Sequence, residues 1–335
     1  MKALKEKFVT TVNYEDYPEY GERAILLSKS DRSLLGEILL IPRLLKATRQ
    51  AKLFLLDSSS GKIHPDLMGT ILIRCLPRSC RPVIVFMGNM WQKDKGIRGT
   101  IQKVVLRLAD GAITRYALQS TGEIPLFSKA WGIPESKTRF VPYFFTFTKR
   151  DFAMPATASG NFIFAGGNSH RDYLPLLEAV DMLREHKFVI ATRLLEGRWL
   201  PPNVQAGSVS HEEFVRLMYA SDAVVVPIKK DLIRAAGQQT YLNAMMFGKP
   251  TIVNNVPGVS DHILDGETAI VVDGTPESYL AAIRKVFDPA NANDIKRMCQ
   301  RAKSVVRQRF TFERHAKQLL NILDEATQEA LPNKK

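Results

Sequence analysis

A short strand, a glycine-containing loop, a helix and a second strand follow one another within residues 221–270, and this stretch constrains the fold most. Residues 223–227 are apolar, β-branched and closed by a proline, which is typical of a buried parallel strand. Helical spacing over 238–247 leads to a further apolar run at 251–253. This order predicts half of a doubly wound nucleotide-binding sheet, in which free N–H groups at a helix start bind phosphate.

The same stretch resembles the donor-binding half of the family 4 glycosyltransferases, which have the GT-B fold. Residues 242–250 read LNAMMFGKP and residues 257–261 read PGVSD, where the family has Leu-Glu-Ala-Met-Ala-x-Gly-Lys-Pro and a Gly-Val-x-Asp/Glu turn. The resemblance is strongest over residues 160–325 and concerns only the layout of residues 1–150. It implies two doubly wound parallel-sheet, Rossmann-like α/β domains that face a cleft.

Alternation of short apolar runs and amphipathic segments also predicts parallel sheets covered by helices. We expect a basic acceptor-side domain over residues 1–150 and a nucleotide-sugar-binding domain over 151–312. The resemblance implies that a helix within 313–335 packs back toward the first domain. Residues 1–20 are interpreted as an extended lead-in, 112–114 as a strand and 146–160 as a linker.

Residues 33–50 predict a helix that places Leu34, Ile38 and Leu44 on one side. Pro42 inside it is expected to kink or split the helix. The three cysteines are too few and too scattered for a disulfide framework, which predicts buried thiols in a reducing cytosol.

Positive charge is concentrated in the first part of the chain. The net charge of the chain is +13, and residues 1–150 hold 25 Lys and Arg against 13 Asp and Glu. Such a field attracts lipid-linked phosphates, polyanions or an anionic membrane surface, although it also serves plain solubility. No nucleic-acid-binding motif accompanies the charge, so a nucleic acid partner is not expected.

Residues 97–108 predict a basic amphipathic helix with Ile97, Ile101 and Val104 beside lysines and arginines. This pattern suits a helix lying on an anionic bilayer, and it equally suits a helix packed on the sheet. No run is long and apolar enough to span a membrane, and the N-terminus does not resemble a secretory signal. We therefore expect a cytoplasmic location, with peripheral attachment to the inner face of the cell membrane as an alternative.

Two glycine-containing loops are the first candidate sites. Gly166 and Gly167 directly follow a predicted strand, and the resemblance implies that Arg171 neutralises the leaving nucleoside diphosphate; the alternative is a surface cation. A second loop, before the helix at 238, predicts a pyrophosphate cradle, with an ordinary capped helix as the alternative. The residues of this second group are Lys229, Gly237, Gln238, Gln239 and Thr240.

The resemblance implies further donor contacts. Backbone groups of Gly207, Ser208 and Val209 match the region that reads the nucleobase. Asn243 stands where the family has a glutamate that receives the ribose hydroxyls, and Ala235 stands where a second glutamate helps to hold the sugar. The missing carboxylates leave open whether transfer is efficient.

The acceptor side offers weaker candidates. The family often has a histidine after the third strand, and this chain has Asn89 nearby, followed by Asp94, as the candidate catalytic residues of the first domain. There is no Asp-x-Asp and no metal-spaced cluster, so a metal-independent enzyme without a cofactor is expected. Its donor substrate is expected to be a nucleoside-diphosphate sugar.

These observations lead to a retaining hexosyltransferase that moves a sugar onto a membrane-linked or polyanionic glycan or lipid acceptor, in cell-envelope or polysaccharide biosynthesis. One alternative is a catalytically degenerate GT-B subunit that binds nucleotide-sugar. The other is a nucleotide-sugar epimerase, for which few acid or base residues are visible.

Overall fold

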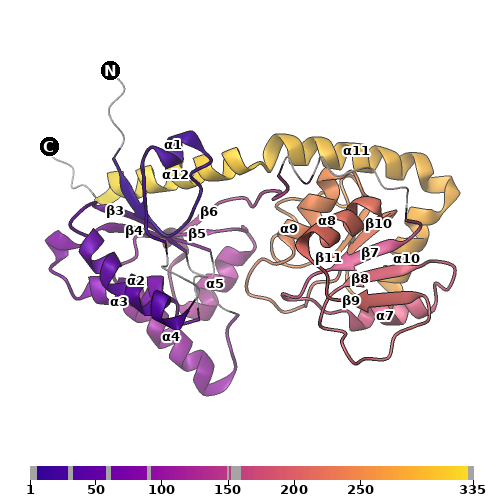
Figure 1. Ribbon diagram of the computed structural model, residues 1–335, viewed down its shortest axis with the longest axis horizontal. Helices are drawn as coiled ribbons and strands as arrows, with labels where there is room; N and C mark the ends of the chain where they lie inside the picture. Colours follow the sequence, from indigo (N-terminus) through magenta and orange to yellow (C-terminus); the bar gives the residue numbers. More distant parts are fainter. Residues whose placement is uncertain are drawn as a thin grey trace. The chain divides into compact units, whose positions relative to one another are not determined.

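The computed structural model describes residues 6–28, 33–57, 62–88, 92–148, 151 and 160–330. The chain divides into two compact units (Figure 1). Unit 1 comprises residues 1–141 together with 313–335, and unit 2 comprises residues 142–312. Residues 142–148, which the sequence assigned to the first domain or the linker, therefore group with unit 2.

Unit 1 is built on a six-stranded parallel sheet with the strand order β2-β1-β3-β4-β5-β6. The strands are β1 Phe8–Thr10, β2 Ala24–Leu26, β3 Leu53–Asp57, β4 Val83–Met87, β5 Arg115–Leu118 and β6 Thr138–Phe140. The helices are α1 Pro18–Gly21, α2 Leu34–Ala47, α3 Pro65–Arg74, α4 Gly96–Asp110, α5 Glu123–Trp131 and α12 Phe312–Ala330, of which all but the first residue belongs to this unit. Two 3₁₀ turns, Arg78–Cys80 and Glu135–Lys137, complete it.

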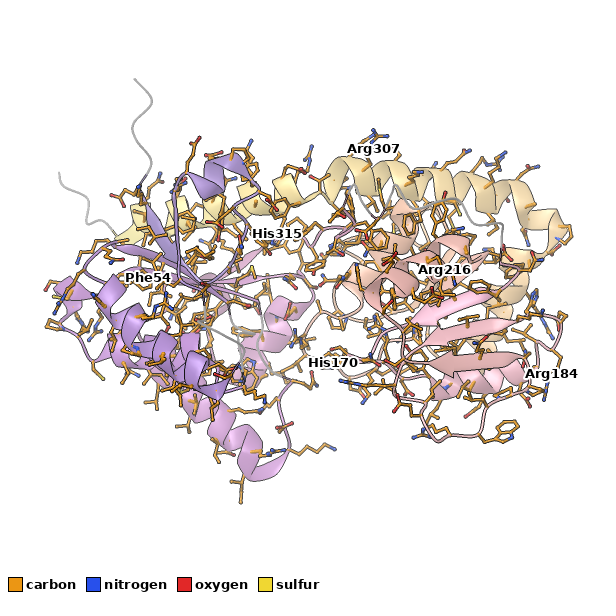
Figure 2. The ribbon with its side chains drawn as sticks, viewed as in Figure 1. Phe54, His170, Arg184, Arg216, Arg307 and His315 are labelled. Carbon is orange, nitrogen blue, oxygen red and sulfur yellow. The ribbon has the colours of Figure 1, made fainter. Side chains whose placement is uncertain are left out.

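Strands of this sheet are buried on both faces, as parallel strands between helices are. Leu53 and Leu55 of β3 pack with Leu319 and Leu323 of α12 on one face. The alternate residue Phe54 is equally buried on the other face (Figure 2), the side of the sheet on which α2, α3 and α4 lie together in Figure 1. The C-terminal helix is therefore part of the core of unit 1.

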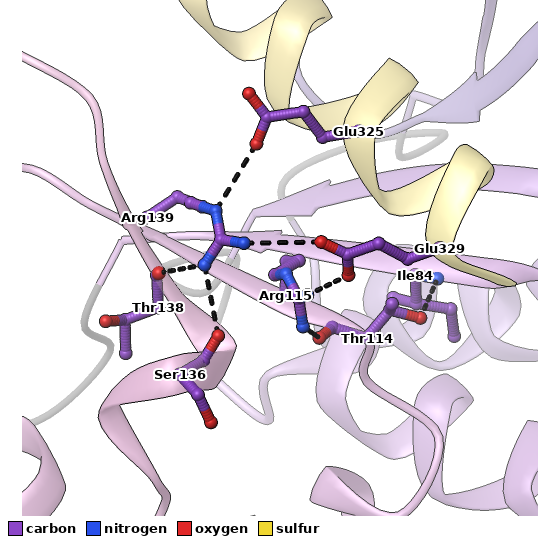
Figure 3. A network of polar contacts seen from close by, with 8 residues as sticks. All are labelled: Ile84, Thr114, Arg115, Ser136, Thr138, Arg139, Glu325 and Glu329. Atoms are coloured by element: carbon purple, nitrogen blue, oxygen red, sulfur yellow. Dashed lines mark hydrogen bonds and ion pairs between the residues drawn. The ribbon is translucent and has the colours of Figure 1, made fainter.

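Charged residues fix the end of α12 on β5 and β6 (Figure 3). Arg139 of β6 donates to the carboxylates of Glu325 and Glu329, each at 3.3 Å. Arg115 of β5 also pairs with Glu329. One residue before Glu325, Asp324 Oδ1 accepts from Arg23 Nη2 at 2.6 Å. These contacts join the last helix to strands nearly two hundred residues or more away in the sequence.

Unit 2 contains a second six-stranded parallel sheet, with the order β12-β11-β10-β7-β8-β9. The strands are β7 Ile163–Gly166, β8 Phe188–Ala191, β9 Val204–Gly207, β10 Ala223–Val226, β11 Thr251–Asn254 and β12 Ile270–Val272. The helices are α7 Leu174–Asp181, α8 His211–Ala220, α9 Gln238–Met246, α10 Pro276–Phe287 and α11 Ala292–Arg309, with a 3₁₀ turn at Pro289–Asn291. Helices α7 and α10 pack on one face of this sheet, and α8 and α9 on the other.

The two predicted doubly wound parallel sheets are confirmed, whereas several local predictions are wrong. Phe8–Thr10 is not lead-in: it forms β1, which pairs with both β2 and β3. Residues 112 and 113 form a turn at the end of α4, in which Ala112 N donates to Ala109 O and Ile113 N donates to Asp110 O. Strand β5 therefore begins only at Arg115. A three-residue strand and a helix-end turn carry too little periodicity to be separated by sequence alone.

Helix α2 also departs from its prediction. It runs unbroken through Pro42, so the proline does not split it. Its buried side is formed by Leu40, Leu44 and Ala47 with Gly36 and Glu37, whereas Leu34 and Ile38 are exposed. Two of the three cysteines, Cys75 and Cys80, are exposed as well, and only Cys299 is buried as predicted.

Candidate functional site

The loops that follow β7 and β10 are joined at the point where the strand order of unit 2 reverses. Ligands of doubly wound sheets bind at such a switch point, beyond the carboxyl ends of the strands. An antiparallel bridge pairs Arg171 with Ile228. Lys229 N donates to His170 O at 2.9 Å and Asp172 N donates to Pro227 O at 3.1 Å. The backbone between the two loops is therefore fixed.

Asn254, at the end of β11, stabilises this junction through two hydrogen bonds to the backbone of Ile228. Its Oδ1 accepts from Ile228 N at 2.6 Å, and its Nδ2 donates to Ile228 O at 2.7 Å. The side chain is buried, so both halves of the amide are used where water cannot replace them. Sequence reasoning missed Asn254; an amide at the carboxyl end of a predicted strand was the available signal.

Arg171 lies buried at the centre of the junction, with 6% of its surface exposed. Its Nε donates to Gly166 O at 3.2 Å, its Nη1 to Ser169 O at 2.9 Å and its Nη2 to Thr240 Oγ1 at 2.9 Å. All three acceptors are neutral, and among the described residues the guanidinium forms no ion pair. Burial lowers the pKa of Arg171, yet an arginine stays protonated. A buried cation without a carboxylate is a site that favours an anion.

Glycines allow the backbone to lie against this guanidinium. Gly167 has a φ of 116°, and a Cβ there would come within 3.1 Å of Arg171 Nε. Its carbonyl accepts from Tyr173 Oη at 2.8 Å and Thr192 Oγ1 at 3.0 Å. A Cβ on Gly166 would lie 2.5 Å from the Phe214 ring. Arg171 precedes the first residue of α7 by three positions, so it lies in the loop and not in the helix.

The start of α9 lies beside the same guanidinium. Gly237 is its N-cap residue, with a φ of 76° and no side-chain hydrogen bond to the helix start. This geometry disfavours the alternative of an ordinary capped helix, because Thr240 turns its hydroxyl toward Arg171. Gln238 is buried and Gln239 is exposed. Free N–H groups at this end of the helix add to the positive potential.

Additional cations surround the junction. The pKa of His170 (Figure 2) is lowered by burial and by the charges of Arg234, Arg171 and Lys229. His170 also has a left-handed backbone, with φ 52°, which orients its carbonyl toward Lys229 N. The Lys229 side chain is exposed. Arg234 was not predicted from the sequence.

Gly207, Ser208 and Val209 lie apart from this junction, at the end of the edge strand β9. They line an open groove of about 1120 Å³, together with Phe162, Arg216 and Leu217. Arg171, Gly237 and Asn243 do not line it. Thr192 connects the two places, since its N donates to Gly207 O at 2.9 Å while its Oγ1 donates to Gly167 O.

Asn243 makes contacts that the resemblance did not imply. Its Oδ1 accepts from Thr146 N at 2.8 Å, and its Nδ2 donates to Thr146 Oγ1 at 3.0 Å. The oxygen assigned to ribose hydroxyls thus already holds the segment 142–148, and the side chain is buried. Ala235 is buried too and offers no polar group.

The two candidates on the acceptor side belong to unit 1. Asn89 lies outside the described residues. Asp94 is exposed. Its backbone N donates to Gln102 Oε1 at 3.0 Å, and Gln102 Nε2 of α4 donates to Asp94 Oδ2 at 3.2 Å. These contacts stabilise the entry to α4. Within the described ranges, no three His, Cys, Asp or Glu side chains are placed to share a metal ion.

Two Rossmann-like parallel-sheet domains in one chain are the architecture of the GT-B fold. Residues 160–288 match the family model described as "Glycosyl transferases group 1". The resemblance to a family 4-like GT-B glycosyltransferase is thus confirmed, and the matched residues lie within the range where it was predicted to be strongest.

Curated and solved proteins agree with this class. A glycogen synthase of Mycobacterium tuberculosis is 28% identical over 151 residues, which is 44% of this chain and 30% of that enzyme. The chain thus spans about 30% of the length of the curated relatives it matches.

Two solved structures share the fold over nearly the whole chain. HepE of Anabaena, in complex with UDP, has a TM-score of 0.68 at 14% identity and covers 96% of this chain and 100% of its own. Sucrose-phosphate synthase of Thermosynechococcus elongatus has a TM-score of 0.64 at 15% identity, covering 92% and 84%. At such identities the likeness concerns the fold alone.

Proposed function

We propose that this protein transfers a hexose from a nucleoside-diphosphate donor, with retention of configuration, onto an anionic, membrane-linked or glycan acceptor. One observation carries the proposal: the buried Arg171 guanidinium has only neutral acceptors and lies beside the uncapped start of α9, at the switch point of unit 2. The group 1 family match over the same unit and the UDP bound to HepE support a nucleotide-sugar donor.

The chemistry follows from charge development in the leaving group. As the bond between sugar and diphosphate breaks, negative charge accumulates on the phosphate oxygens. Arg171 and the N–H groups of α9 stabilise that charge without requiring a divalent ion, because they are fixed in place by Thr240 and Asn254 before the donor arrives. In a retaining same-face displacement the leaving phosphate oxygen takes the acceptor proton, so no protein base is required at that position.

The acceptor is assigned to unit 1 because of its charge. Residues 1–141 hold 23 Lys and Arg against 13 Asp and Glu, and residues 313–335 hold four of each, so unit 1 carries +10 of the net charge of +13. An anionic or lipid-linked acceptor is the substrate class that this field attracts. Peripheral attachment to a membrane surface belongs to the same proposal. None of the helices in the described ranges combines the length and hydrophobicity of a membrane span.

A degenerate GT-B subunit is the second candidate, and a specific observation favours it. Asn243 is engaged by Thr146, and Ala235 offers no polar group to a sugar. Such a protein binds the nucleotide without transferring the sugar.

The first experiment measures thermal stabilisation by nucleoside diphosphates and nucleotide-sugars, for the wild type and for Arg171→Ala. A ligand that binds only the folded state raises the Tm in proportion to the logarithm of its concentration over Kd. Arg297→Ala on α11 is the control, because Arg297 is exposed and pairs with Asp294. Stabilisation by one nucleotide, lost only in Arg171→Ala, supports the donor site, and its absence for every nucleotide contradicts it.

A second assay separates transfer from binding. Release of nucleoside diphosphate that depends on a lipid-linked or polyanionic acceptor establishes the transferase. Stabilisation without any release supports the degenerate subunit, and interconversion of free nucleotide-sugars identifies an epimerase.

A further inference from the structure

Helix α4 exposes more of its large apolar residues than it buries. Gly99, Leu106 and Ala109 are its buried residues. Its exposed large apolar residues are Ile97, Ile101, Val104 and Leu108, with Ile97 80% and Ile101 56% exposed. The spacing of four, three and four residues places them on one stripe of the helix. The sequence pattern also suited packing of this stripe on the sheet, but in the structure the stripe is exposed.

Neighbouring helices extend this apolar surface. Leu34, Leu35, Ile38 and Leu39, in the first half of α2, are exposed, and so is Leu72 of α3. Helix α3 contacts both α2 and α4, so the three helices form one layer, which can be followed in Figure 1. We call these nine residues, from Leu34 to Leu108, the α2–α4 patch. Many large apolar side chains exposed on three packed helices are typical of a surface that binds a partner.

Cations that no carboxylate neutralises accompany the patch. Arg43 and Lys46 of α2 and Arg98, Lys103 and Arg107 of α4 form no ion pair within the described parts of the chain. The acidic residues of the same helices are otherwise engaged: Glu37 is buried and accepts from Lys62 N and Ile63 N, and Asp110 pairs with Lys137. The layer therefore presents aliphatic groups and uncompensated positive charge together.

We propose that the α2–α4 patch docks unit 1 onto an anionic phospholipid bilayer. Aliphatic side chains of α2 and α4 enter the region just below the headgroups, while the lysines and arginines extend their stems along the surface to the lipid phosphates. A nucleic acid would match the positive charge of the patch but not its aliphatic stripe. Proteins bind nucleic acids through phosphates, base edges and aromatic stacking.

The position of the patch gives the docking a purpose, and this step rests on the proposed function. In a parallel sheet each helix starts near the carboxyl end of the preceding strand, so Leu34 and Ile97 lie toward the carboxyl edge of the unit 1 sheet. Acceptors of a doubly wound domain bind at that edge. A bilayer on this surface would present lipid-linked acceptors there.

The test is cosedimentation of the full chain with phosphatidylcholine vesicles, with and without phosphatidylglycerol. Ile101→Asp is compared with Leu264→Asp, which adds the same charge at an exposed leucine of unit 2, 55% exposed against 56%. The wild type should bind the vesicles that contain phosphatidylglycerol and should be released by 0.5 M salt. Ile101→Asp should bind at least about tenfold more weakly, whereas Leu264→Asp should stay within about twofold of wild type.

Several results would overturn docking. They are failure of the wild type to bind anionic vesicles, equal losses in the two variants, and a wild-type dimer that Ile101→Asp dissociates without any vesicle binding. Thermal stabilisation by the panel of nucleoside diphosphates, measured on the same preparations, distinguishes the two proposals. A normal shift with one of them and no vesicle binding contradicts only the docking, and vesicle binding without a shift from any of them contradicts only the donor site.

Discussion

Thr240 Oγ1 accepts a hydrogen bond from Arg171 Nη2 at 2.9 Å, across 69 residues of sequence. The contact ties the loop after β7 to the first turn of α9, and both side chains are buried. It orients a cation and a helix N-terminus toward the same volume, which is the arrangement that a diphosphate requires.

Replacing Thr240 with valine should therefore weaken nucleotide binding with little change in shape. The variant leaves one N–H of the buried Arg171 guanidinium without its acceptor. An unsatisfied buried donor of this kind costs about 1–3 kcal/mol of stabilising free energy. We expect the affinity for the nucleoside diphosphate that stabilises the wild type to fall several-fold in isothermal titration, and Thr240→Ser, which keeps the hydroxyl, to restore most of it. Equal affinities for the valine and serine variants would contradict the orienting role.

Gly237→Ala should destabilise unit 2 more than Gly266→Ala, although both glycines have positive φ values, 76° and 71°. A Cβ at Gly237 would lie 2.4 Å from Ile228 Cδ1, whereas none of the neighbouring atoms comes within 4 Å of one at Gly266. Left-handed strain costs both variants about 1 kcal/mol, and crowding adds about 1–3 kcal/mol at Gly237 alone. Urea unfolding measures the difference; equal losses would argue against the close approach.

Asn243→Ala tests whether this residue is structural. The variant leaves Thr146 N without the acceptor at 2.8 Å, so the free energy of unfolding should fall by about 1–3 kcal/mol. The affinity for the stabilising nucleoside diphosphate should change little if the amide serves only residues 142–148. A large loss of affinity with unchanged stability would instead favour the ribose contact that the family resemblance implies.

The pH dependence of stability should reflect His170. Burial and the charges of Arg234, Arg171 and Lys229 lower its folded-state pKa below the ordinary 6.5. The unfolded chain then binds more protons below about pH 6.5, so this histidine lowers stability as the pH falls through that value. His170→Asn, which tolerates a φ of 52°, should reduce the fall in Tm between pH 7.5 and pH 5. An unchanged pH profile would exclude this origin.

Glu325→Gln combined with Glu329→Gln should loosen α12 from β5 and β6 in a salt-dependent manner. The pairs with Arg115 and Arg139 are partly exposed, so we expect a loss of only about 1 kcal/mol at low salt. The difference from wild type should shrink in 0.5 M salt because screening weakens the pairs that remain in the wild type. A loss that does not depend on salt would show that packing, not charge, accounts for the effect.

The sequence predicted the two sheets because short apolar runs such as 223–227 and 251–253 are bounded by clear turns. It also predicted phosphate contacts for the loop of Gly237 and Thr240, and the family resemblance implied one for Arg171. The pairing of Asn243 with Thr146 and the role of Asn254 depend on neighbours far along the chain, which no local pattern encodes.

Helix α2 shows the other limit. Its sequence is apolar on more than one side, so periodicity alone could not say which leucines face the sheet. Gly36 and Glu37 face inward, because Glu37 accepts from Lys62 N and Ile63 N, and Leu34 and Ile38 are thereby turned outward. The buried polar contact of Glu37 and the packing of Leu40 and Leu44 together define the buried side of the helix.

The most direct test of the donor site takes the nucleoside diphosphate that stabilises the wild type and compares its Kd with that of its nucleoside, for wild type, Arg171→Lys and the control Arg297→Ala. If Arg171 binds the diphosphate, the wild type should prefer the nucleoside diphosphate strongly, and Arg171→Lys, which keeps a charge but not the fork of donors, should lose at least about tenfold in affinity for it. Nucleoside binding should be unchanged in all three proteins. Equal affinities of wild type and Arg171→Lys for the nucleoside diphosphate would contradict the account.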